Sequence, residues 1–343
     1  MESILALDNV WLALLLKLVL LLGFFLTAPL VVGYIEHKGL AHMQSRLGPM
    51  EAGRFHGIGQ LPADGVKFLQ KEDIIPAAAD RWVFSLAPGV ALVPALVVLA
   101  VVPLGPGLWV EDLDSGIFFA LAVSSVGVLG VLMAAWSSAN KYSLMGGIRA
   151  AAQLIAYELP LVLGAAGVVL QAQTLSLVEI VEAQHSFTLL GVVPVPYAVP
   201  QAVGLALFFV AALAELSRPP FDMPIADSEI IFGHMTEYTG LRYAFFMLAE
   251  YAGMVVLSAL TTVLFLGGWY VWPGVPLPEG ALGVLIGFAV SFGKIATLTF
   301  VMIWFRATFP RLREDQLQRM SWLFLIPLAL LNIVGVAIAK VYG

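Results

Sequence analysis

The sequence contains no cysteine and few charged residues, and both absences limit what the protein can be. Without cysteine, the chain cannot hold thiolate-ligated iron–sulfur clusters or cysteine-ligated zinc. A redox centre of that kind would have to lie on a partner. Charged residues make up only 12% of the 343 residues, compared with about 25% in ordinary globular proteins. Because 60% of the residues are hydrophobic, we expect the chain to be solvated by lipid.

Common catalytic and metal-binding motifs are also missing. We find no phosphate-binding glycine-rich loop, no His-Glu-x-x-His motif and no Ser/His/Asp arrangement. The five histidines are scattered without the spacing of metal ligands, so we predict no metal site. The net charge of −6 argues against a nucleic-acid partner.

Long apolar segments dominate the remaining sequence. A helix needs about 20 apolar residues to cross a hydrocarbon core. Segments of this kind lie at about 11–35, 82–103, 115–137, 150–171, 198–216, 242–266, 281–305 and 320–341. The pattern predicts an all-α integral membrane protein with eight transmembrane helices, organised as a single domain over residues 1–343.

The basic residues predict the orientation. Of the 17 Lys and Arg residues, 14 fall in loops on one side of the predicted membrane. Since loops rich in Lys and Arg remain in the cytoplasm, this side is expected to be cytoplasmic. It includes a loop at 36–81 and an acidic loop at 217–241. With an even number of spans, both termini are then extracytoplasmic.

The loop at 36–81 contains a segment with helical periodicity. Its apolar positions are Phe55, Ile58, Leu61 and Phe68. Polar and charged residues share the opposite face, namely Gln60, Asp64, Lys67 and Lys71. We expect a short amphipathic helix on the cytoplasmic membrane surface. An ordinary interfacial anchor would have the same pattern.

Three carboxylates fall within predicted spans: Glu158, Glu215 and Glu250. Insertion scales put the cost of such a group at about 2.5–3.5 kcal/mol, so each requires an explanation. Each acid could be paired with a neighbouring helix, and Lys17 in the first span is one candidate partner. Alternatively, three acids in consecutive spans could form a path for protons, because burial makes a carboxyl group able to bind a proton near neutral pH.

Motifs along essentially the whole chain, in order, resemble those of the H subunit of bacterial respiratory complex I. The segments that carry the resemblance are Glu36-His37-Lys38, Arg46-Leu47-Gly48-Pro49, Gln60-Leu61-Pro62-Ala63-Asp64, Lys141 to Arg149, Tyr157-Glu158-Leu159, Ala214 to Asp222, Thr236-Glu237-Tyr238, Leu266-Gly267-Gly268-Trp269 and Arg306 to Leu317. The arrangement also resembles the alternative complexes I of actinobacteria.

The resemblance implies a subunit of a proton-pumping NADH-quinone oxidoreductase in the bacterial plasma membrane. Such a subunit binds no cofactor of its own. It borders a chamber in which quinone, the substrate, reaches an iron–sulfur cluster of a partner subunit, and its other partners are small membrane-arm subunits and lipid. The matching chamber positions are Arg46, Gln60, Asp64, Lys67 and Phe221. The positions expected to couple quinone reduction to proton movement are Glu158, Glu215, Glu250, Asp222, Asp227, Glu229 and Glu237.

Two positions depart from the family pattern. Relatives have three acids where this chain has Ile225, Asp227 and Glu229, so one acid is lost. Ser125 stands where some bacterial relatives have a buried Glu. Other hypotheses are an ion-translocating module of a membrane-bound hydrogenase-type complex, a stand-alone transporter and a structural anchor. A transporter would be expected to show inverted repeats, and the sequence has no such repeat.

Overall fold

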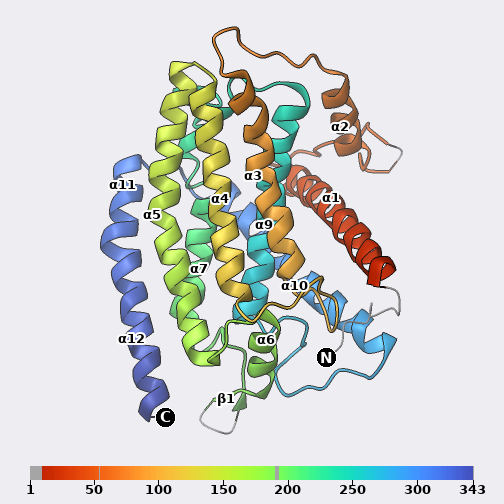
Figure 1. Cartoon of the computed structure of the whole chain (residues 1–343), viewed down its shortest axis with the longest axis vertical. Coiled ribbons are helices and arrows are strands. Elements are labelled where there is room, and N and C mark those ends of the chain that lie inside the picture. Colours follow the sequence, from red (N-terminus) through yellow and green to blue (C-terminus); the bar gives the residue numbers. More distant parts are fainter. Residues whose placement is uncertain (1–9, 54, 190–192, 343) are drawn as a thin grey trace.

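The computed structural model describes residues 10–53, 55–189 and 193–342 (Figure 1). Within these ranges seven helices are long and apolar enough to cross a membrane. They are α1 (Val10–Met43), α3 (Arg81–Val101), α4 (Gly116–Ser137), α5 (Lys141–Ala172), α9 (Gly240–Phe265), α10 (Ala281–Thr308) and a last span built from α11 (Glu314–Arg319), a π-helical segment η3 (Met320–Leu325) and α12 (Ile326–Tyr342). The prediction of an all-α membrane protein is confirmed.

The fifth predicted span, at 198–216, corresponds to α7 (Ala202–Glu215), which is shorter than the other spans. Its 14 residues extend about 21 Å, which is less than a hydrocarbon core of about 30 Å. Neighbouring helices surround it, and one row of its side chains, from Leu207 and Phe208 to Ala214, is buried. Because α7 ends at Glu215, the backbone that follows lies within the protein, where other parts of the chain can satisfy its polar groups.

The segment between α7 and α9 folds into short pieces against α5. They are a 3₁₀ turn η1 (Met223–Ile225), α8 (Asp227–Ile230) and a second 3₁₀ turn η2 (Gly233–Met235). Glycine permits the close approach, because a Cβ atom at Gly146 of α5 would overlap the backbone of Gly233. The side chain of Gln153 in α5 donates to the carbonyls of Ala214 and Phe221, at 2.8 and 2.7 Å. These contacts fix the acidic loop relative to α5.

The predicted amphipathic helix corresponds to α2 (Gln60–Gln70), which lies beside α1 outside the main bundle (Figure 1). The side chain of Leu61 covers Gly33 of α1. The ring of Phe68 lies 5.7 Å from that of Tyr243 in α9. Apolar contacts with both spans therefore hold α2 in place.

The remaining elements close the opposite end of the bundle. A short helix α6 (Leu177–Ser186) is followed by two paired strand segments, β1 (Thr188–Leu189) and β2 (Val193–Pro194). Figure 1 shows that α1 begins and α12 ends at this same end. The last span packs on α5 through polar contacts, because Tyr157 donates to the Leu317 carbonyl at 3.0 Å and Gln318 to the Ala152 carbonyl at 3.0 Å.

Candidate functional site

A group of four charged side chains, of which Arg306 is exposed at 39%, connects α1, α9 and α10 with the chain that follows α7. We call Glu36, Arg218, Glu250 and Arg306 the Arg218 cluster. Arg218 donates from Nη1 to both carboxylate oxygens of Glu36, at 2.8 and 2.7 Å. Its Nε lies 2.5 Å from Oε1 of Glu250, and Arg306 forms a second ion pair with Glu36. The cluster contains two positive and two negative groups.

Burial makes this pairing essential. The side chains of Arg218 and Glu36 are only 3% and 1% exposed, while that of Glu250 is 18% exposed. The guanidinium of Arg218 also lies over the ring of Tyr251, 4.7 Å from its centre. Burial alone would lower the pKa of Arg218, but the charges of Glu250 and Glu36 raise it above its usual value. Arg218 therefore remains charged, and its acids neutralise it.

Sequence reasoning assigned Glu250 but missed its partners. Glu36 and Arg218 lie in motifs that carry the family resemblance, yet their charges were attributed to loops. The signal was the position of Glu36, directly after the first apolar segment. The helix continues beyond that segment to Met43, so Glu36 faces the protein interior from within α1.

A cavity of about 160 Å³ adjoins the cluster. Glu215 and Glu250 both line it, together with Ser124, Ser217 and His234. A cavity needs only about 10–15 Å³ of such space to hold one water molecule, so this one has room for several. Most of the lining is apolar, and these five polar side chains are the hydrogen-bond partners that it offers to water.

Two polar atoms at this cavity have no hydrogen-bond partner among the described residues. They are Oε2 of Glu215 and Nδ1 of His234. Burial lowers the pKa of His234 from 6.5 to about 4, so the imidazole is neutral at pH 7. A neutral imidazole and an unpaired carboxyl group are both able to bind water or a proton in this space.

The third predicted acid, Glu158 of α5, is half-buried. It is not among the residues that line the cavity, whereas Glu215 and Glu250 both line it. Lys17 is not joined to these acids, since its ammonium group donates to the carbonyl of Val110 at 2.9 Å.

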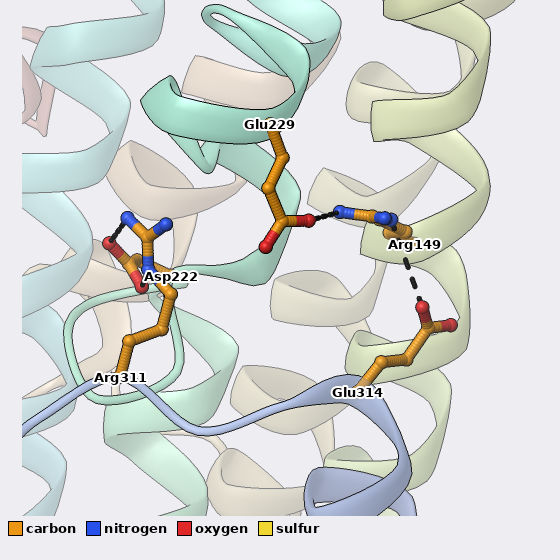
Figure 2. Close-up of polar contacts among 5 residues, drawn as sticks. All are labelled: Arg149, Asp222, Glu229, Arg311 and Glu314. Atoms are coloured by element: carbon orange, nitrogen blue, oxygen red, sulfur yellow. Dashed lines mark hydrogen bonds and ion pairs between the residues drawn. The ribbon is translucent and has the colours of Figure 1, made fainter.

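The acids of the loop at 217–241 form contacts near the surface (Figure 2). Asp222 accepts two hydrogen bonds from Arg311, both of 2.6 Å. Glu229 pairs with Arg149 at 2.6 Å, and Arg149 also lies 3.7 Å from Glu314 of α11. These contacts connect the loop to α5 and to the start of the last span.

Two more loop acids complete the predicted set. Glu237 accepts a hydrogen bond of 2.5 Å from Nδ2 of Asn140, the residue that caps the start of α5. Asp227 begins α8, but its side chain lies outside the part of the chain that the structure describes.

The predicted chamber residues lie in three separate places. On α2, Asp64 accepts from Lys67 at 2.7 Å and from Gln60 at 3.1 Å. Burial raises the pKa of Asp64, but the hydrogen bonds from Lys67 and Gln60 outweigh it and hold the pKa below its usual value. Arg46 is exposed and donates to Gln44 at 2.8 Å. Phe221 is buried in the core against the ring of Tyr157, at 5.5 Å.

Within the described ranges, no group of three or more His, Asp or Glu side chains is arranged to hold a metal ion.

Comparison with known proteins agrees with the family resemblance. A family model described as NADH dehydrogenase matches residues 16–337. A protein from Geobacillus kaustophilus is 46% identical over 308 residues, which cover 90% of this chain and 88% of the relative. A second, from Geobacillus thermodenitrificans, is 45% identical and covers 95% of this chain and 92% of the relative.

A third relative, from Bacillus mycoides, is 47% identical over 89% of this chain and 87% of its own length. All three relatives are named as the H subunit of NADH-quinone oxidoreductase. The predicted resemblance is thereby confirmed. The multi-pass membrane fold, the ordered motifs and this similarity over nearly the full length establish that the chain belongs to the NADH dehydrogenase family, among proteins similar to the H subunit of NADH-quinone oxidoreductase.

Proposed function

We propose that the chain is a membrane subunit of an NADH-quinone oxidoreductase that couples quinone reduction to proton translocation. The observation that carries this proposal is the position of Glu250, which pairs with Arg218 on one side and lines a hydratable cavity with Glu215 on the other. A change in charge at the cluster therefore acts directly on a group that contacts the cavity. The names of the relatives favour this function over the hydrogenase-type alternative.

In the proposed reaction, quinone takes up two electrons, which would come one at a time from an iron–sulfur cluster of a partner subunit, and two protons to become quinol. Loss of protons from nearby groups leaves negative charge at the acidic loop from Asp222 to Glu237. We propose that Arg46, Gln60, Asp64, Lys67 and Phe221 border the quinone chamber. Of these, the hydrogen-bonded set on α2 supplies a fixed charge pattern at its entrance.

We propose that the loop transmits the effect of this negative charge to the Arg218 cluster. Arg218 and Asp222 lie in the same connection between α7 and η1, and Asp222 is held by Arg311. A shift of this segment alters how Arg218 is shared between Glu36 and Glu250. Removing one partner from a buried ion pair costs about 3–5 kcal/mol. That exceeds the roughly 2.3 kcal/mol that 100 mV of membrane potential supplies per charge.

Proton movement then follows the acids. When Arg218 moves toward Glu36, Glu250 loses its neutralising partner and binds a proton from the cavity. The Glu215 carboxyl group, at the same cavity, is proposed to be next, followed by Glu158. Glu158, Glu215 and Glu250 therefore form the proposed start of the proton path. The acids of the loop are proposed to respond to the change in charge when quinone is reduced. They are Asp222, Asp227, Glu229 and Glu237.

The cellular setting is part of the proposal. We infer that the protein lies in the bacterial plasma membrane, with the loop at 36–81 and the acidic loop at 217–241 in the cytoplasm and both termini outside. Its partners would be the peripheral quinone-site and iron–sulfur subunits, the small membrane-arm subunits and membrane lipid. Their contacts would cover α2 and the ion pairs drawn in Figure 2.

The decisive test is Glu250→Gln in the assembled complex, reconstituted in sealed vesicles. NADH-driven quinone reduction and proton uptake, followed with a pH-sensitive dye, are measured together. We expect protons moved per quinone reduced to fall by at least about tenfold, because an amide does not titrate. Glu182→Gln, at an exposed site on α6, is the matched control and should pump normally. Normal pumping by Glu250→Gln would remove this acid from the path.

A further inference from the structure

A large apolar cavity lies far from the acids, beside the first half of α1. Its volume is about 660 Å³, and its walls come from α1, the end of α3, the loop after α3, and α10. Apolar side chains dominate the lining, among them Leu20, Phe24, Leu99 and Phe288. Figure 1 shows that the N-terminal end of α1 lies away from the main bundle. The cavity lies toward the end of the bundle that carries α6.

The lining of the cavity includes one cationic side chain. Lys17 lines the cavity and donates to the carbonyl of Val110 at 2.9 Å. A lysine ammonium has three donors, so this bond leaves capacity for an anionic oxygen. Trp109, which follows the end of α3, lines the same cavity. Lysine and tryptophan together at the end of a span are typical of the level of lipid headgroups.

We propose that this cavity binds a phospholipid, with its phosphate at Lys17 and an acyl chain along Leu20, Phe24 and Leu99. The division of the site into one cationic end and an otherwise apolar body matches the division of a phospholipid. Positive charge at the membrane surface selects anionic headgroups, so an anionic phospholipid is the preferred ligand. The bound lipid fills the space between α1 and the rest of the bundle.

The charge in the lining favours a lipid over a helix of a partner subunit. Charged side chains are rare in transmembrane helices, whereas an anionic phospholipid brings a negative group to Lys17. A flexible acyl chain can follow the irregular walls without leaving polar backbone groups unpaired.

The site can be blocked at Gly23, which lines the cavity and has no atom within 4 Å of a Cβ built on it. Gly23→Phe should fill the cavity without a clash at the backbone. The matched control is Gly335→Phe on α12, where a Cβ likewise meets open space. Lys17→Gln removes the charge, and Lys340→Gln is its control, because Lys340 also donates to backbone carbonyls near the end of a span.

The experiment uses the intact complex reconstituted in phosphatidylcholine vesicles that contain a small fraction of phosphatidylglycerol with a photoreactive acyl chain. After illumination, labelled peptides are mapped by mass spectrometry, and quinone reductase activity verifies assembly. We expect labelling of the segments around Phe24 and Leu99, reduced at least about fivefold by Gly23→Phe. Lys17→Gln should remove a preference of about fivefold for photoreactive phosphatidylglycerol over photoreactive phosphatidylcholine. Both control variants should label normally.

Three results would overturn the proposal. Undiminished labelling in assembled Gly23→Phe complexes would place the lipid elsewhere. Loss of labelling on addition of excess quinone would make quinone the occupant. A photoreactive amino acid at position 23 that crosslinks to another subunit, and not to lipid, would show that a protein segment fills the cavity.

Discussion

The Arg218 cluster and the ion pairs of the acidic loop use the same chemical groups in opposite environments. In the cluster, Arg218 and Glu36 are 3% and 1% exposed. In the ion pair between Arg149 of α5 and Glu229 of the loop, shown in Figure 2, the side chains are 21% and 45% exposed. Salt screens exposed charges beyond a Debye length of about 8–10 Å, whereas buried charges are screened much less.

This difference in exposure suits the two groups of ion pairs to different roles. Exposed pairs contribute little to stability and can exchange partners with water, so they can respond to a reaction at low cost. Buried charges must remain compensated, so any rearrangement of Arg218 has to be matched at Glu36 or Glu250. The surface pairs are thus suited to sense charge, and the buried cluster is suited to transmit it. The following predictions compare the two regions, from the largest expected effect to the smallest.

Replacing Arg218 should have the largest effect. Arg218→Met leaves Glu36 and Glu250 in the interior with less positive charge, and we expect a loss of about 3–5 kcal/mol in stability. Thermal unfolding and subunit assembly of the purified complex measure this loss. Arg313→Met is the control, because the side chain of Arg313 is 79% exposed. Equal melting of the Arg218 and Arg313 variants would mean that the ion pairs of the Arg218 cluster do not stabilise the protein.

Acid should destabilise the protein through His234. Its folded-state pKa, about 4, lies below the value of 6.5 expected in the unfolded chain. The contribution of the neutral imidazole is therefore fully present above pH 6.5 and is lost as the pH falls toward 4. Over that pH range, the free energy of unfolding should fall by about 3 kcal/mol.

His234→Phe should remove this pH dependence while stability near pH 8 changes less. Melting temperatures measured at several pH values, for the original and variant complexes, provide the test. His185→Phe is the control, since His185 lies on α6 away from the cavity that His234 lines. A variant whose melting temperature falls with acid as steeply as the original would contradict the assignment.

Replacing Glu215 should affect proton translocation much more than it affects stability. Its Oε2 atom has no hydrogen-bond partner within the described part of the chain, so Glu215→Gln breaks no ion pair found there. We expect a stability change of no more than about 1 kcal/mol, with proton translocation strongly reduced. Thermal unfolding and dye-based pumping assays measure the two effects. A loss as large as that of Arg218→Met would indicate that Glu215 is a structural partner.

The smallest effect is expected at the surface. Glu229→Gln removes the ion pair with Arg149 and should cost about 0–1 kcal/mol. Because salt screens the pair, the difference from the original complex should shrink as ionic strength rises. Melting curves at low and high salt measure this. A salt-independent loss would mean that Glu229 is buried in the assembled complex.

The elements of this fold that depend on short-range pattern could be read from the sequence. Runs of about 20 apolar residues predict spans because every buried backbone group must be paired within the helix. The amphipathic pattern around Gln60 and Asp64 likewise predicted α2. Span ends were less accurate, since α1 continues through Glu36 to Met43 and α7 ends after 14 residues.

Only part of the candidate site could be predicted from the sequence. Glu158, Glu215 and Glu250 were identifiable because a carboxylate in an apolar span is costly. Sequence did not reveal that Phe221 is buried against Tyr157, or that Arg46 points to Gln44 and not to α2. Those outcomes depend on how the loops fold back, which local preferences do not specify.

By itself, then, the sequence determined that this protein is helical, lies in the membrane and has acids within its spans. Only the tertiary structure decided which charges meet. Glu36, Arg218, Glu250 and Arg306 are separated by up to 270 positions in the chain, yet they form one cluster. The physical reason is that hydrophobicity acts along each helix, whereas a buried charge is satisfied only by a partner that packing brings within a few ångströms.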